Sequence, residues 1–190
     1  SPLLTELRAL ELIYEKVAHP ELAYMFKHAL THDVAYESIL VQRRKELHRA
    51  IGIAIEELYG DRLVEHHETL ALHFTRGEDW PRAFAYHTRA AEKALGSYAN
   101  HAAVAHCREA LAVADRLGDR VTAAERCHLE EMLGAASMWI TEFAASGEAF
   151  RRAAACADTP AHRSVALGWA SHSFLWAHHY DIARDVLREA

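Results

Sequence analysis

Histidine is the residue type in this chain that could do the most chemistry. Fifteen histidines occur in 190 residues, and several are close enough in sequence to suggest shared ligands. His66, His67 and His73 fall within eight residues, and His178 is followed at once by His179. A zinc site, however, needs three or four ligands converging on one point, and no HExxH helix motif is present. We therefore expect no metal site and interpret most of these histidines as surface or half-packed groups.

A second candidate is the dipeptide His32-Asp33, which occurs in the metal-dependent HD phosphohydrolases. That chemistry needs further His and Asp ligands from separate helices, so the dipeptide by itself is a weak signal. The simpler interpretation is that Asp33 caps the start of a helix. Neither a GxSxG nucleophile motif nor a GxxxxGK[ST] phosphate loop is present. We expect a non-catalytic chain, and a helical metal-dependent hydrolase remains a less favoured alternative.

Composition narrows the class of protein. The hydrophobic fraction of 51% predicts a folded chain, and no window is apolar enough for a membrane span. A net charge of −6 argues against nucleic acid as a partner, since phosphate binding requires clustered Lys and Arg. The three cysteines are widely separated and form no CxxC motif, which is typical of a reducing cytoplasm. Both ends read as cut, which indicates a fragment of a longer polypeptide.

The N-terminal third predicts a helix, a hairpin and a long helix. Two β-prone runs, 11–17 and 22–29, are separated by the four residues 18–21, a spacing that suits a hairpin. From Asp33 to Gly60 the pattern predicts one long helix. Its expected apolar stripe consists of Tyr36, Ile39, Leu40, Leu47, Ile51, Ile55 and Leu58.

From residue 61 onward the sequence pattern predicts short helices, each bounded by residues that typically begin or end a helix. Gly77, Gly96 and Gly118 mark ends, whereas Asp79 and Asp158-Thr159-Pro160 mark starts. Small residues recur seven positions apart in the second helix of each expected pair: Ala83 and Ala90, Ala103 and Ala110, Ser146 and Ala153, Ala183 and Ala190. Three copies also fit in their first helix, through Leu70, Ala71 and Phe74, then Leu133, Gly134 and Ser137, then Ala170, Ser171 and Phe174.

This pattern resembles the tetratricopeptide repeat, a helix pair of about 34 residues in which small residues let neighbouring helices approach closely. The fourth copy, around Cys107, fits only in its second helix. We therefore predict an all-α helical-repeat solenoid with a short β-hairpin near the N-terminus. Such repeats expose an inner surface for partner segments. Of the four tryptophans, Trp80 is expected at a helix start, and Trp139, Trp169 and Trp176 mainly in seams between helices. The less favoured alternative is that a subset of them lines a concave groove.

The stretch from Glu11 to Leu95, with "YMFKHALTHDVAYESILVQRRKELH" at its centre, resembles the region after the ATPase module in bacterial STAND-type signalling ATPases. Many of these are fused to class III adenylate/guanylate cyclase or DNA-binding domains. The resemblance implies the end of a winged helix at 1–32, a connecting helix at 33–60 and tetratricopeptide-like repeats at 61–190. It also implies a sensor role for His28, because a histidine after the last wing strand contacts the phosphates of ADP in related ATPases. His48 matches the family pattern too, and we interpret it as structural.

These expectations combine into one functional prediction. The chain is expected to be a non-catalytic interaction and sensor region of a cytoplasmic signalling ATPase or cyclase. It would need no cofactor of its own, although ATP or ADP would bind in the full-length protein near His28. The expected partners are a protein or peptide on the repeats and the effector domain of the same polypeptide, with neither nucleic acid nor a membrane involved. A stand-alone helical-repeat adaptor is the main alternative.

Overall fold

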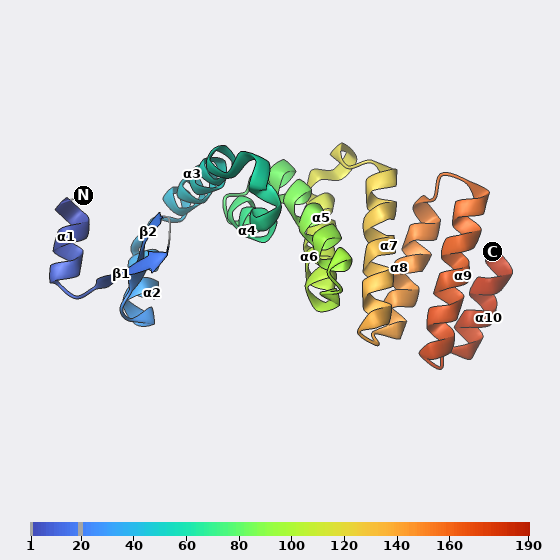
Figure 1. Cartoon of the computed structure of the whole chain (residues 1–190). Coiled ribbons are helices and arrows are strands. Elements are labelled where there is room, and N and C mark those ends of the chain that lie inside the picture. The colour runs from blue at the N-terminus through green and yellow to red at the C-terminus, as the bar shows by residue number, and fades with distance from the viewer. Residues whose placement is uncertain (1, 19–20) are drawn as a thin grey trace. The chain divides into compact units, whose positions relative to one another are not determined.

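The computed structural model describes residues 2–18 and 21–190, and of residues 17, 18 and 21–23 it describes the backbone alone. The chain divides into two compact units, residues 1–46 and 47–190. It is an all-α fold with one short two-stranded antiparallel sheet, as the sequence predicts (Figure 1). None of the described helices combines the length and the apolar character that a bilayer crossing requires.

The first unit holds the predicted hairpin. Helix α1 (Pro2–Ala9) precedes strands β1 (Ile13–Ala18) and β2 (Glu21–Phe26), whose register pairs Ile13 with Phe26. Residues 19 and 20 of the expected turn lie outside the described residues. Ion pairs hold the base of the hairpin, Arg8 with Glu15 and Lys27 with Glu11. Helix α2 (Ala29–Ser38) follows directly after the second strand.

The expected single helix over 33–60 is two helices, which corrects the sequence-based boundary. Helix α2 ends at Ser38, Ile39 is extended with ψ 129°, and α3 (Val41–Tyr59) starts afresh. The Ser38 hydroxyl donates to the Ala35 carbonyl, a local bond that competes with continued helix. The helical pattern on both sides of the break made it hard to see in the sequence.

The expected cap at Asp33 is also wrong. Helix α2 begins one turn earlier, with His28 at the N-cap position, and Asp33 lies inside the helix with its carboxylate 2.9 Å from the His32 ring. On α3 the apolar stripe is displaced from its expected face. Ile51 and Leu58 are exposed, whereas His48, Gly52 and the half-buried Ile55 face inward.

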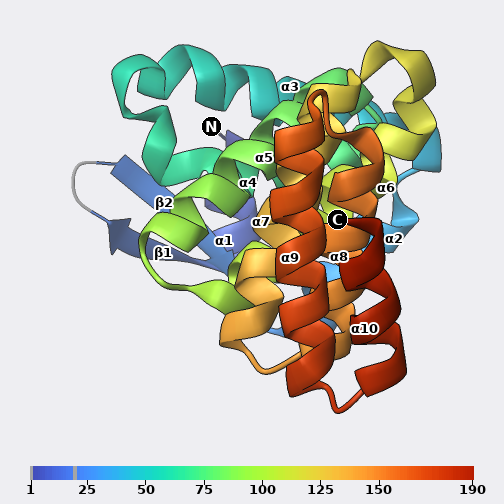
Figure 2. The same cartoon turned by 90° about the vertical axis from the view of Figure 1, so that its right-hand side faces the viewer.

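The second unit is a row of antiparallel helices. After α3 and a short 3-10 segment (Gly60–His66) come α4 (His67–Arg76), α5 (Trp80–Gly96), α6 (Asn100–Leu117), α7 (Ala123–Trp139), α8 (Phe143–Cys156), α9 (Pro160–Trp176) and α10 (Tyr180–Glu189). Figure 2 shows α8, α9 and α10 side by side. The predicted stops at Gly60, Gly77, Gly96 and Gly118 and the starts at Asp79 and Thr159 are confirmed.

One turn geometry recurs four times in this row. Glu78, Tyr98, Thr141 and His178 all have a positive φ between 56° and 62°. In each turn the next residue donates its backbone N–H to the carbonyl five positions earlier, as Asp79 does to Phe74 at 2.9 Å and His179 does to Phe174 at 2.9 Å. The left-handed residue lets the chain reverse within three residues, so consecutive helices pack antiparallel.

The turn at Tyr98 completes the copy for which the sequence predicted only a second helix. Helix α5 is the partner of α4 through the turn at Glu78 and of α6 through the turn at Tyr98. Except for Ala190, the small residues of the pairs are buried, including Ala71, Ala83, Ala103 and Ser146. In the last pair the expected packing positions Leu187 and Ala190 are exposed instead.

Candidate partner-binding groove

Two of the helices that open a pair, α7 and α9, form the walls of an apolar groove. Helix α7 starts at a capping box, in which the Thr122 hydroxyl accepts from the Glu125 N–H and the Glu125 carboxylate accepts from the Thr122 N–H. Helix α9 starts at Thr159, whose hydroxyl accepts from the His162 N–H, with Pro160 in the first turn. Local hydrogen bonds thus fix the residue at which each of the two helices begins.

The groove has a volume of about 430 Å³, within the ~300–1,000 Å³ usual for ligand sites. Seven of its eight lining residues are apolar, and Glu131 at one end is the exception; the set is Glu131, Ala135, Met138, Trp139, Phe150, Val165, Ala166 and Trp169. Trp139 is 73% exposed, Val165 59% and Trp169 48%. Large apolar side chains left open to water in one patch are typical of an interaction site.

Phe150 of α8 forms the floor of the groove. Its side chain is buried and its ring stacks on Trp169, with ring centroids 6.2 Å apart. Gly134 makes this position available, because a Cβ there would lie 2.8 Å from the Phe150 ring. A glycine in the middle of α7 therefore lets the aromatic floor sit directly against the helix backbone.

The aromatic face continues along α9 beyond the groove. Trp169, His172 and Trp176 follow at helical spacing, and the Trp176 indole donates to the His172 ring at 3.1 Å. Trp176 also stacks on Phe143 and remains 59% exposed. The expectation that Trp139, Trp169 and Trp176 lie mainly in helix seams is therefore wrong. The alternative, that a subset of them lines a groove, fits Trp139 and Trp169. Trp80 does lie at a helix start, beneath the Arg116 guanidinium.

His28, the site residue named from the family resemblance, lies between β2 and α2. Its backbone is extended (φ −128°, ψ 131°), and its carbonyl accepts from the N–H groups of Thr31 and His32. Its exposed side chain makes no capping hydrogen bond. The ring is thus open to a group outside this chain, and the nucleotide-sensor role stays a prediction.

The other histidines singled out from the sequence have separate surroundings. The His66 ring packs against the Tyr59 ring at a tilt of 31°, with centroids 3.9 Å apart. His67 is buried and its Nδ1 has no hydrogen-bond partner. His73 lies in the α3–α4 contact, where its Nδ1 is 2.9 Å from Nδ1 of His48. The interpretation of His48 as a packed structural residue is confirmed.

Within the described part of the chain, one group of three side chains has ligand atoms close enough for a metal ion: Cys127, Glu131 and His162. The sequence pattern did not predict this group. Its members come from two helices, 31 and 35 positions apart, so no local spacing reveals them.

No protein-family model matches this chain, and no curated protein matches it either.

Proposed function

We propose that this chain is the non-catalytic partner-binding region of a cytoplasmic signalling ATPase or cyclase. In this proposal the helical row, which resembles tetratricopeptide repeats, binds a segment of a partner protein. The first unit, which resembles the end of a winged helix, passes that event to the ATPase or effector domain. The single observation that carries the proposal is the open apolar groove between α7 and α9.

The chemistry of the groove points to one kind of occupant. Its exposed tryptophans, Trp139 and Trp169, stand on opposite walls and would enclose a large apolar side chain between them. Aromatic residues of this kind usually supply most of the binding free energy at an interface. The one charged lining residue, Glu131, lies at an end and favours a basic residue there. The expected occupant is a peptide segment with aromatic or long aliphatic anchors and a flanking Lys or Arg.

The exposed apolar surface of the first unit favours a second contact, with another domain. Among its described side chains Ile13 is the buried apolar one, and many large apolar side chains are exposed: Leu3, Leu10, Met25, Phe26, Leu30, Val34, Leu40 and Val41. Leaving this much apolar surface in water is unfavourable, by about 25 cal/mol per Å². A domain that covers this surface would gain that free energy, as the effector module of the proposal would.

A peptide-display experiment tests the groove directly. A phage library of random 16-residue peptides is selected on the immobilised 190-residue chain, and the dissociation constants of enriched peptides are measured by fluorescence anisotropy. We expect enriched peptides to carry aromatic or leucine anchors at helical or alternate spacing. Trp139→Ala and Trp169→Ala should each weaken binding at least tenfold, since loss of such an anchor costs about 2 kcal/mol or more.

Trp176→Ala is the matched control, because Trp176 is an equally exposed tryptophan on α9 that does not line the groove. It should leave the affinity unchanged, and circular dichroism should show all three variants folded. If neither Trp139→Ala nor Trp169→Ala changed the dissociation constants of the peptides, the groove assignment would be refuted. Nucleotide turnover by the chain itself would refute the non-catalytic role.

A further inference from the structure

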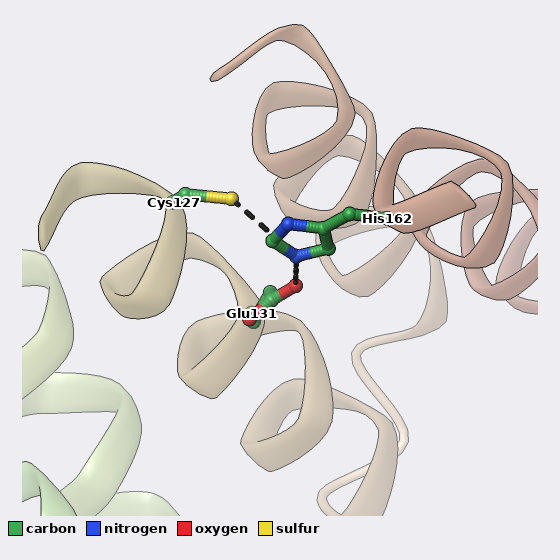
Figure 3. A group of neighbouring side chains, drawn as sticks. All are labelled: Cys127, Glu131 and His162. Atoms are coloured by element: carbon green, nitrogen blue, oxygen red, sulfur yellow. Dashed lines mark hydrogen bonds and ion pairs between the residues drawn. The ribbon is translucent and has the colours of Figure 1, made fainter. Parts of the chain in front are cut away.

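The N-terminal turns of α7 and α9 bring three different ligand types together (Figure 3). Cys127 and Glu131 lie one turn apart on α7, and His162 lies in the first turn of α9. Nε2 of His162 is 3.8 Å from Sγ of Cys127 and 2.5 Å from Oε1 of Glu131. The three ligand atoms all lie within 4.8 Å of one another. The imidazole therefore meets a sulfur and a carboxylate at a single point.

The second ring nitrogen and the backbone N–H of His162 also have partners. Nδ1 of His162 is 3.1 Å from Oδ1 of Asp158, and the His162 N–H is bonded to the Thr159 hydroxyl. In protein metal sites a carboxylate on the far nitrogen commonly fixes the tautomer and aims the other nitrogen at the ion. Asp158 occupies that place, so the lone pair on Nε2 would face Cys127 and Glu131.

A second sulfur lies against the same backbone carbonyl. Sγ of Cys127 is 3.3 Å from the Ala153 carbonyl oxygen, and Sγ of Cys156 is 3.5 Å from it. Cys156 is the last residue of α8, two positions before Asp158, so it can supply a fourth ligand from the third helix of this corner.

We propose that Cys127, Glu131, His162 and Cys156 bind one Zn²⁺ ion that ties α7, α8 and α9 together. Mixed sulfur, imidazole and carboxylate ligands suit Zn²⁺, whereas Mg²⁺ and Ca²⁺ prefer oxygen alone. Tetrahedral Zn²⁺ would separate a sulfur and an imidazole nitrogen by about 3.6 Å and a nitrogen and a carboxylate oxygen by about 3.3 Å. For Cys127, Glu131 and His162 the observed distances of 3.8 and 2.5 Å require small side-chain rotations only. Cys156 lies outside this group and would have to turn away from the Arg152 carbonyl to reach the ion.

Binding exchanges protons for the ion. Burial, with the neighbouring Cys156 thiol, raises the pKa of Cys127 to about 12, so without metal its sulfur carries a proton. Coordination releases three protons to solvent: those of the two thiols and the Nε2 proton that His162 donates to Glu131. Glu131 gives up this hydrogen bond and becomes a ligand, while Nδ1 of His162 keeps its proton and its bond to Asp158. The two proposals share Glu131, which lines the groove and is a ligand here. Bound Zn²⁺ would therefore take this carboxylate away from a basic residue of the peptide, whereas the tryptophan walls of the groove do not take part in the metal site.

Metal titration of the tag-free 190-residue chain, kept reduced with a phosphine, tests the site. CoCl₂ should bind at one equivalent and give a sulfur-to-cobalt charge-transfer band in the near ultraviolet, with intense visible bands of four-coordinate cobalt. One equivalent of ZnCl₂ should abolish these bands. It should also raise the thermal unfolding midpoint, and a chelator should reverse the rise.

Four substitutions locate the ligands. Cys127→Ser and His162→Gln should weaken Zn²⁺ binding at least 100-fold, and Asp158→Asn should weaken it about 10- to 100-fold through the orientation of His162. Cys156→Ser should lower the charge-transfer intensity by about half, as expected when one of two thiolates is lost. If Cys127→Ser fails to fold, His162→Gln still decides the matter, because that side chain is a third exposed.

His128→Gln is the matched control, since His128 is an exposed histidine beside Cys127 that pairs with Glu92 instead. It should bind Zn²⁺ like the unaltered chain. Cobalt spectra without a sulfur band, binding that survives His162→Gln, or no binding at micromolar metal would each overturn the proposal. An unchanged spectrum in Cys156→Ser would overturn the four-ligand set.

Discussion

Four imidazoles line the contacts that join α3, α4, α5 and α6. The rings of His48 and His73 share one hydrogen bond, and Nδ1 of His87 is 3.1 Å from Nδ1 of His106. Nε2 of His87 is also 3.0 Å from the Thr75 hydroxyl. In each imidazole pair one ring must be neutral, because only a neutral ring has a nitrogen that can accept the hydrogen bond. Protonation of both rings would therefore break the bond.

These contacts predict a loss of stability in mild acid. Burial, and secondarily the neighbouring His106, lowers the pKa of His87 to about 4. Burial also lowers the pKa values of His73 and His106. Between pH 6.5 and 4 the unfolded chain therefore binds more protons than the folded one, and the stability present above pH 6.5 is lost as the pH falls. For His87 the loss amounts to about 2–3 kcal/mol.

Urea unfolding at pH 7.5, 6 and 5 measures this dependence. His87→Gln keeps a polar group beside Thr75 but cannot titrate, so its free energy of unfolding should vary less with pH over that range. His101→Gln, at an exposed position of α6, should keep the full dependence. Equal pH profiles for both variants would show that His87 does not carry the effect.

At the scale of elements, glycines set how closely the helices approach. Gly52 of α3 meets the ring of Phe74 on α4, Gly134 meets Phe150, and Gly147 of α8 meets the ring of Phe174 on α9. In each case an added Cβ would lie 2.7–2.8 Å from a ring atom. Neighbouring helices are thus joined by an aromatic ring lying on a glycine backbone, and this contact recurs along the row.

We expect Gly147→Ala to be destabilising. The Phe174 ring is fully buried and has no room to move away from the new methyl group. Overpacking of this kind costs about 1–3 kcal/mol, which exceeds the gain of up to ~1 kcal/mol from replacing a helical glycine by alanine. Thermal or urea unfolding measures the difference.

Gly168→Ala supplies the control for this prediction. Gly168 lies within α9, and a Cβ there meets nothing within 4 Å. The substitution should raise the free energy of unfolding by about 0.5–1 kcal/mol. If the two alanine variants changed stability in the same direction, close helix approach would not be the function of Gly147.

At the scale of the whole molecule, the buried core belongs to the second unit. The three clusters of buried apolar residues lie between Leu70 and Val186, whereas Ile13 is the buried apolar side chain described in the first unit. A hairpin with two short helices and so little core is marginal by itself. The two units should therefore contribute unequally to stability.

A truncated chain over 41–190, which keeps α3 whole, should fold by itself. Its thermal midpoint by circular dichroism should lie close to that of the full chain, and its unfolding should stay cooperative. A peptide over 1–46 should show no cooperative transition. A large drop in the midpoint of the truncated chain would mean that the hairpin unit stabilises the helical row.

The sequence by itself determined the helical class, the hairpin, and most helix ends in the second unit. Gly77, Asp79 and Thr159-Pro160 act through hydrogen bonds within one turn, so their effect is readable locally. The small residues also predicted which helices pair, because close approach leaves a spacing in the sequence. The sequence did not predict the break at Ile39, because helical periodicity continues on both sides of it.

Tertiary structure alone decided which side chains meet across helices. Trp139 and Trp169 became the walls of a groove, and Cys127, Glu131 and His162 became neighbours, only when α7 and α9 came side by side around α8. The axial position and rotation of each helix depend on packing, such as the Phe150 ring on Gly134. No spacing along one helix records that information, which is why the candidate sites had to be found in space.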